Sequence, residues 1–170
     1  MSLAPLLEAN PVIQVHAISA IFAFFIGPII FYGRKGTRLH KLLGRLWVLS
    51  MGLAIVSSAF IWQVRLVGPF SPIHILTVLS GWGIISGVNA AIKGRIAQHE
   101  AAMKGLYFWA LGAAGVFTFL PDRIMNRMFF PEHSLAGFYF VLGVYLAVLL
   151  MWKLKLVQYF TSQETGLPKM

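Results

Sequence analysis

The chain has 170 residues, of which 58% are hydrophobic and only 11% are charged, and its mean hydropathy is +0.77. A soluble domain carries about 25% charged residues, so this composition predicts an integral membrane protein with one domain over residues 1–170. The formal net charge of +9 resides mostly in short segments between apolar runs, which favours the lipid bilayer as partner and excludes nucleic acid. The absence of cysteine excludes disulfides and thiolate ligands.

Five apolar segments follow one another along the chain. Asn10 with Pro11 is typical of a helix start, Thr37 is a candidate cap for the second helix, and Ser71 with Pro72 repeats the first signal. A helix needs about 20 apolar residues to span a bilayer. We therefore expect an all-α bundle of five transmembrane helices, followed by a polar tail over 156–170. The expected helices cover about 11–32, 38–64, 72–92, 100–120 and 134–155.

The positive charges predict the orientation of these helices. Five alternating spans would place eleven Lys and Arg side chains on one side of the membrane and three on the other. The richest segment is Arg34–Arg45, which holds five of them. Because Lys and Arg are retained on the cytoplasmic side, we expect the N-terminus outside and the C-terminus in the cytoplasm.

Each expected helix carries a histidine towards its N-terminal end. Helices 1 and 3 would run in parallel, so His16 and His74 share the outer face, and His40 and His99 share the inner face. In an up-down bundle these helices are diagonal, with axes roughly 13 Å apart. A haem held by one histidine from each diagonal helix fits that gap. The pattern predicts one or two b-type haems, with His16 and His74 as one pair of iron ligands and His40 and His99 as the other.

Other side chains fit the same hypothesis. Arg38, Arg45 and Lys104 could pair with haem propionates, and Met103, four residues after His99, is a second candidate soft ligand. Small residues one to three turns after His16 would leave room for a macrocycle: Ala20, Ala23 and Gly27. Alternatives remain at each position, since small residues in membrane helices usually serve packing and interfacial histidines and arginines usually contact headgroups. His133 has no diagonal partner and is interpreted as such an interfacial residue.

Four motifs resemble a known family. GRKGTRLHKLLGR, GPFSPIHIL, IAQHEAAMKGLY and FTFLPDR, within about residues 10–128, are together similar to a bacterial multi-pass membrane family known only as domain of unknown function 2306. The resemblance implies a small protein of the bacterial inner membrane and implies no activity. Histidines on alternate helices also resemble, as a pattern only, the diheme b-type transmembrane reductases.

The sequence thus favours a transmembrane electron carrier that exchanges electrons with a quinone or a larger redox complex. A non-catalytic accessory or assembly subunit of a respiratory or photosynthetic complex is the first alternative, because no catalytic motif is present. A lipid- or quinone-binding protein is the second, with a pocket near Trp47, Met51, Trp82 and Trp109. Whether the protein is an enzyme stays open at this point.

Overall fold

The computed structural model describes the backbone of residues 2–61 and 72–165, and the side chains of 2–61, 75–151, 153 and 154. These residues contain helices and turns and no strand, as expected for an all-α protein. The chain divides into two compact units, Ser2–Gly115 and Val116–Met170. The expectation of one domain over 1–170 stays a prediction.

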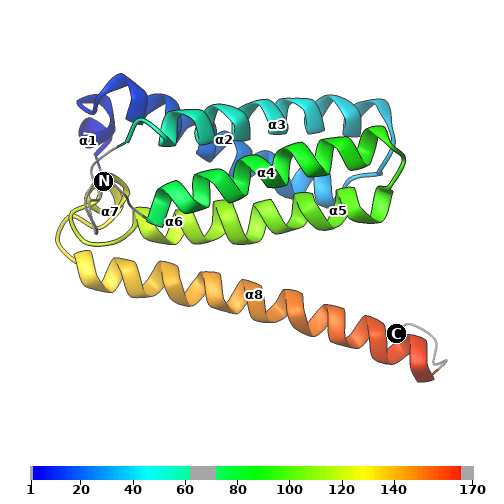
Figure 1. Cartoon of the computed structure of the whole chain (residues 1–170). Helices are drawn as coiled ribbons and strands as arrows, with labels where there is room; N and C mark the ends of the chain where they lie inside the picture. Colours follow the sequence, from blue (N-terminus) through cyan, green and yellow to red (C-terminus); the bar gives the residue numbers. More distant parts are fainter. Residues whose placement is uncertain (1, 62–71, 166–170) are drawn as a thin grey trace. The chain divides into compact units, whose positions relative to one another are not determined.

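The first unit is a four-helix bundle with a short leading helix (Figure 1). Its helices begin where the capping signals predict. The Asn10 side chain accepts a hydrogen bond from the Val12 N–H at 2.9 Å, and Thr37 Oγ1 accepts one from the His40 N–H at 3.1 Å. The helices are α1 (Ala4–Leu7), α2 (Pro11–Tyr32), α3 (Arg38–Ser58), α4 (Pro72–Ile92) and α5 (Ile96–Gly105), and α5 leads into the π-helix η1 (Leu106–Gly112).

Tight turns join these helices at one end. Gly36 (φ 77°) and Gly94 (φ 70°) adopt the left-handed conformation that glycine accepts without strain. We call the end of the unit that holds segments 33–37 and 93–95 the basic end, because both segments are rich in Lys and Arg. The expected end of the second helix, at residue 64, lies outside the described residues, and α3 ends at Ser58.

Four helices among the described residues are long and apolar enough to cross a membrane. They are Pro11–Tyr32, Arg38–Ser58, the Ile75–Ile92 part of α4, and Ser134–Met151. The region of the expected fourth span is helical from Ile96 to Thr118, but it consists of α5, η1 and α6 (Ala113–Thr118) in succession. The π segment divides this region into short helices, so the count of five spans stays a prediction.

Hydrogen bonds between helices link the bundle into a closed ring. Lipid offers no hydrophobic drive for helix association, so packing and interhelical hydrogen bonds must hold the helices together. Each neighbouring pair has such a bond between the following groups: His16 Nδ1 with the Ala54 carbonyl (2.8 Å) for α2–α3, Ser58 Oγ with Thr77 Oγ1 (2.8 Å) for α3–α4, His99 Nδ1 with the Gly87 carbonyl (2.9 Å) for α4–α5, and Tyr107 Oη with the Phe24 carbonyl (3.1 Å) for η1–α2.

A proline in α2 explains the last of these bonds. Pro28 has no N–H, so the carbonyl four residues before it, that of Phe24, has no intrahelical partner. The Tyr107 hydroxyl donates to this carbonyl, and its ring packs so closely over Gly27 that a Cβ there would overlap the ring. Phe24 and Phe31 contact the same ring, at centroid distances of 5.9 and 5.2 Å. Gly27 and Pro28 thus form a notch in α2 that receives a side chain from η1.

The second unit consists of the end of α6, the short helix α7 (Ile124–Phe129) and α8 (Ser134–Thr165). Asn126, fully buried, holds the connector together, because its Nδ2 donates to the carbonyls of Phe119 (2.6 Å) and Ser134 (2.8 Å). The expected polar tail from residue 156 is helical to Thr165, since no glycine or proline interrupts the run before Gly166.

Candidate functional site

Two of the expected haem ligands lie on interior faces at the basic end. His40 shares a face of α3 with the buried Trp47 and Met51, at roughly 100° per residue, and its Nδ1 is buried without a hydrogen-bond partner among the described residues. His99 shares a face of α5 with Met103, and its Nδ1 bonds to the Gly87 carbonyl. α3 and α5 do not follow each other around the ring of helices, so these imidazoles come from diagonal helices, as the sequence predicts.

The other expected pair is described only in part. His16 is partly buried, and its Nδ1 bonds to the Ala54 carbonyl at 2.8 Å, with Ser57 Oγ at 3.4 Å. A ring that donates from Nδ1 to a carbonyl presents an unprotonated Nε2, which is how metal-binding histidines are commonly oriented. His74 lies in the first turn of α4, but its side chain is outside the described residues. His133 is exposed before α8.

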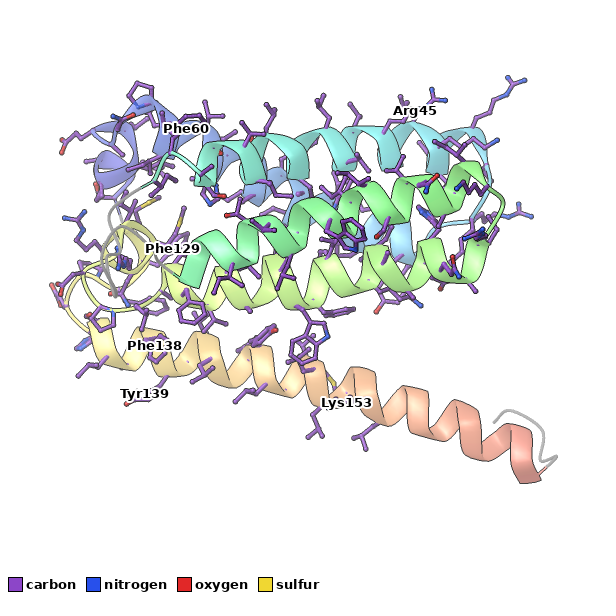
Figure 2. The ribbon with its side chains drawn as sticks, in the orientation of Figure 1. Arg45, Phe60, Phe129, Phe138, Tyr139 and Lys153 are labelled. Carbon is purple, nitrogen blue, oxygen red and sulfur yellow. The ribbon has the colours of Figure 1, made fainter. Side chains whose placement is uncertain are left out.

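The two arginines expected to bind propionates lie away from these histidines. Arg38 and Arg45 are exposed and stand about 140–160° around α3 from His40 at roughly 100° per residue. Arg45 projects on the side of α3 away from α4 and α5 (Figure 2). Both side chains therefore belong to the outward face of the bundle.

Lys104 takes part in a small ion cluster at the basic end. Glu100 Oε1 lies 2.6 Å from Lys104 Nζ, in the same helix, and 2.5 Å from Lys35 Nζ, in the turn before α3. Hydrogen bonds from Lys104 and then Lys35 lower the pKa of Glu100 from 4.5 to about 2. One carboxylate thus ties the turn 33–37 to the start of α5.

The centre of the bundle is filled with side chains. Trp47, Met51, Met103 and Leu106 are buried there, and the Trp47 Nε1 donates to the Ala23 carbonyl at 3.0 Å. Met103 fills the notch at Gly87, where a Cβ would overlap its terminal methyl group, and Leu106 fills that at Gly83. A Cβ added at Gly44, one turn after His40, would meet nothing within 4 Å. The position beside Gly44 is therefore open, whereas those beside Gly83 and Gly87 are filled by neighbouring side chains.

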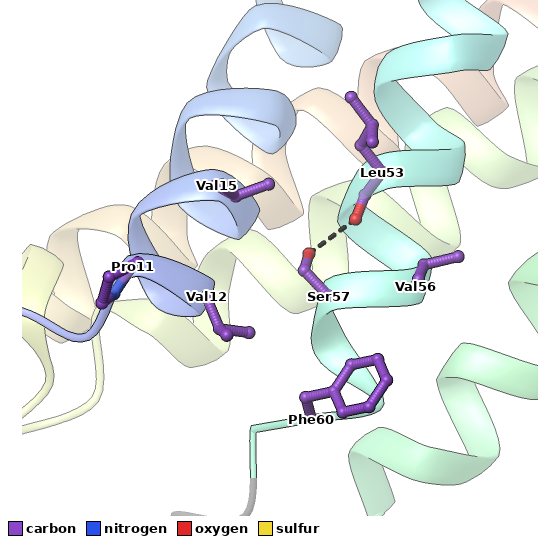
Figure 3. Close-up of a pocket in the computed structure, with 7 residues that line it drawn as sticks. All are labelled: Pro11, Val12, Val15, Leu53, Val56, Ser57 and Phe60. Carbon is purple, nitrogen blue, oxygen red and sulfur yellow. Dashed lines mark hydrogen bonds between the residues drawn. The ribbon is translucent and has the colours of Figure 1, made fainter.

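An apolar groove of about 310 Å³ lies between α2 and α3 at the opposite end (Figure 3). It is lined by Pro11, Val12, Val15, Leu53, Val56, Ser57 and Phe60. Ser57 contributes the one hydroxyl group of the lining, and this hydroxyl already donates to the Leu53 carbonyl at 2.6 Å. His16 follows the lining residue Val15 in sequence. The groove lies at the ends of two membrane-length helices, and its lining is almost entirely apolar.

Three structurally important residues escaped the sequence prediction. Neither Tyr107 nor Pro28 belongs to a recognisable motif. A proline inside an apolar run does indicate, however, that the carbonyl four residues before it lacks its intrahelical N–H partner. Glu100 could have been found from the sequence, since it is the only acidic residue in segments 34–45 and 93–104, which hold eight Lys and Arg.

No cluster of three or more His, Cys, Asp or Glu that could hold a metal ion occurs among the described residues.

Several apolar helices of membrane-spanning length, with apolar side chains on their outer faces, define a multi-pass helical membrane protein. A family model described as predicted membrane protein (DUF2306) matches residues 13–151, and the chain belongs to this family. No curated protein and no solved structure matches the chain. The family description names no activity.

Proposed function

We propose that this protein is a transmembrane electron-transfer protein that binds b-type haem at the basic end of its bundle. The observation that carries the proposal is His40. Its ring lies on the interior face of α3, and its buried Nδ1 has no partner among the described residues. Leaving a buried polar atom without a partner costs about 1–3 kcal/mol, which bonding to an iron atom would offset.

The surroundings of His40 support a second ligand. His99 lies on the interior face of the diagonal helix, and the bond from its Nδ1 to the Gly87 carbonyl leaves Nε2 as the nitrogen that can bind a metal. The open position at Gly44 offers room beside His40. Two imidazoles are the kind of ligand that b-type haem takes, and a bound haem would supply one-electron chemistry.

The residues of the chain have distinct tasks in this proposal. His40 and His99 bind and orient the group, while buried Trp47 and Met51 exclude water from the bundle centre. Lys104, the third predicted propionate partner, stands about 140° around α5 from His99 at roughly 100° per residue and already pairs with Glu100. A second haem on His16 and His74 rests on the sequence pattern, and a quinone or a larger redox complex is the proposed electron partner.

An optical spectrum of the purified protein tests the proposal. We expect a Soret band and a pyridine haemochrome of b-type haem, at one or two haems per chain. His40→Ala and His99→Ala should each remove one haem, whereas His133→Ala, an exposed histidine, serves as the matched control and should leave the ratio unchanged. Gly44→Leu should also remove that haem without unfolding the helices, which circular dichroism checks. Protein without haem after expression with added haem would refute the proposal.

The groove between α2 and α3 favours a second candidate function, the binding of a lipid or of the isoprenoid tail of a quinone. Its apolar lining and its position beside His16 and Ser57 support this role. Solvent extraction of the purified protein followed by mass spectrometry should then recover an isoprenoid or lipid in stoichiometric amount. Val56→Trp should displace it from the groove, and the exposed Val78→Trp on α4 is the control.

A further inference from the structure

A stripe of three cations runs along the outward face of α3. Arg38, Lys41 and Arg45 follow one another at spacings of three and four residues and are all exposed. We call these three residues the basic stripe. It stands opposite the interior face of α3 that carries Trp47 and Met51, so its side chains face the surroundings of the bundle.

The stripe has no acidic partner within the described part of the chain. The two ion pairs found there both use Glu100, and they engage Lys35 and Lys104. Three neighbouring cations on one helix face repel one another by a few tenths of a kcal/mol per pair. An anion from outside the chain would relieve this repulsion.

The length of the stripe along the helix axis indicates at which depth in the membrane that anion lies. Arg38 to Arg45 spans about 10 Å of helix at 1.5 Å per residue, whereas a headgroup layer is roughly 5–8 Å thick. Arg45 therefore reaches the level at which headgroups meet acyl chains. Apolar side chains flank it on the same outward face and are all exposed: Leu42 (56%), Leu46 (38%) and Leu49 (60%).

We propose that the basic stripe is a binding site for an anionic phospholipid. The phosphate oxygens pair with the arginine guanidinium groups, which offer two parallel N–H donors, and Lys41 adds a third charge. The acyl chains pack on Leu42, Leu46 and Leu49. Orientation in the membrane does not require this stripe, because Arg34, Lys35, Lys93 and Arg95 already place positive charge in the turns.

Competition between two lipids tests the proposal. The full-length protein is reconstituted with equal amounts of phosphatidylglycerol and phosphatidylcholine, and retained lipids are counted by native mass spectrometry. We expect enrichment of phosphatidylglycerol by about fivefold per cation, since each cation near a membrane surface contributes about 1 kcal/mol. The triple variant Arg38→Gln, Lys41→Gln, Arg45→Gln should lose this enrichment. If that variant does not fold by circular dichroism, Arg45→Gln alone should lower it about fivefold.

The matched control removes the same charge from the turns, by Arg34→Gln, Lys93→Gln and Arg95→Gln. This control should retain the enrichment. Equal loss in both triple variants would mean that only the net charge matters and would overturn the site. The proposal would also be overturned if 10 mM inorganic phosphate, a concentration on the order of the Kd of a weak anion site, abolished the enrichment. The stripe would then bind a free anion instead of a lipid.

Discussion

Single polar side chains in this protein satisfy the backbone of the next helix. His16, Trp47, His99 and Tyr107 all bond to a carbonyl oxygen across a helix interface. An unsatisfied polar group inside a membrane costs several kcal/mol, so such residues position helices as well as occupy space. His40 differs from them, because its buried Nδ1 has no such partner among the described residues. This contrast is why His40 carries the proposed function.

At the same scale, the loss of stability caused by Glu100→Gln should itself depend on pH. The folded-state pKa of Glu100 is lowered to about 2 from 4.5, so its contribution is present above about pH 4.5 and is lost as the pH falls towards 2. The group is partly exposed, and we expect the variant to be about 0.5–1 kcal/mol less stable at pH 7. Thermal unfolding in detergent from pH 7 to pH 2.5 measures the difference, which should shrink across that window.

Glu8→Gln is the control for this experiment, because Glu8 is exposed and forms no ion pair among the described residues. Its stability difference from the parent protein should be near zero at every pH. A constant difference for Glu100→Gln from pH 7 to pH 2.5 would contradict the ion cluster.

At the scale of elements, the notch of α2 explains how η1 is held. Pro28 frees a carbonyl, Gly27 removes the side chain that would block access, and Tyr107 enters with both its hydroxyl and its ring. The π segment begins one residue before Tyr107. π-Helical turns are rare and occur mostly as short interruptions inside α-helices. The interruption of the expected fourth span thus coincides with its contact to α2.

A double-mutant cycle between Tyr107 and Pro28 tests this account. Tyr107→Phe should lower stability by about 1 kcal/mol, because the Phe24 carbonyl loses its donor. In a Pro28→Ala background the alanine N–H can satisfy the same carbonyl, so the second loss should be much smaller. Chemical unfolding of the four proteins in mixed micelles measures the coupling. Additive losses would show that the hydroxyl does not serve the carbonyl freed by proline.

At the scale of the molecule, the ring of four helices sets which ends lie together. The turns 33–37 and 93–95 meet at the basic end, where Lys35 reaches Glu100. The same end holds His40, His99 and the basic stripe, so the proposed haem site and the proposed lipid site open at one face of the membrane. The orientation of that face towards the cytoplasm is a prediction from charge alone.

Cysteine labelling can decide the topology, since the chain has no cysteine of its own. Single substitutions Lys35→Cys and Arg95→Cys should both be labelled from the cytoplasmic side by a reagent that does not cross membranes. Arg123→Cys should be labelled from the opposite side if Ile96–Thr118 spans the bilayer. Labelling of residues 95 and 123 from the same side would refute five spans.

The sequence sufficed for features that depend on local chemistry. Apolar run length predicts the helices, and Asn10 and Thr37 mark helix starts that the structure confirms to the residue. Charge alone locates the basic segments, because Lys and Arg are costly inside a bilayer. The alternation of the helices also predicted that His40 and His99 come from diagonal helices at one end of the bundle, whereas the sequence left open whether His40 points into the bundle or out to the headgroups.

Tertiary structure decided the features that depend on which helices touch. Arg38 and Arg45 were predicted to pair with haem propionates because they share the inner face of the membrane with His40, yet both are exposed on the opposite face of α3. Gly27 of α2 was interpreted as space for a macrocycle, yet the Tyr107 ring packs over it. A glycine in a helix indicates only that some group approaches closely. At Gly27, Gly83 and Gly87 that group is Tyr107, Leu106 and Met103, which lie 16–80 positions away in the chain and so beyond the reach of local pattern.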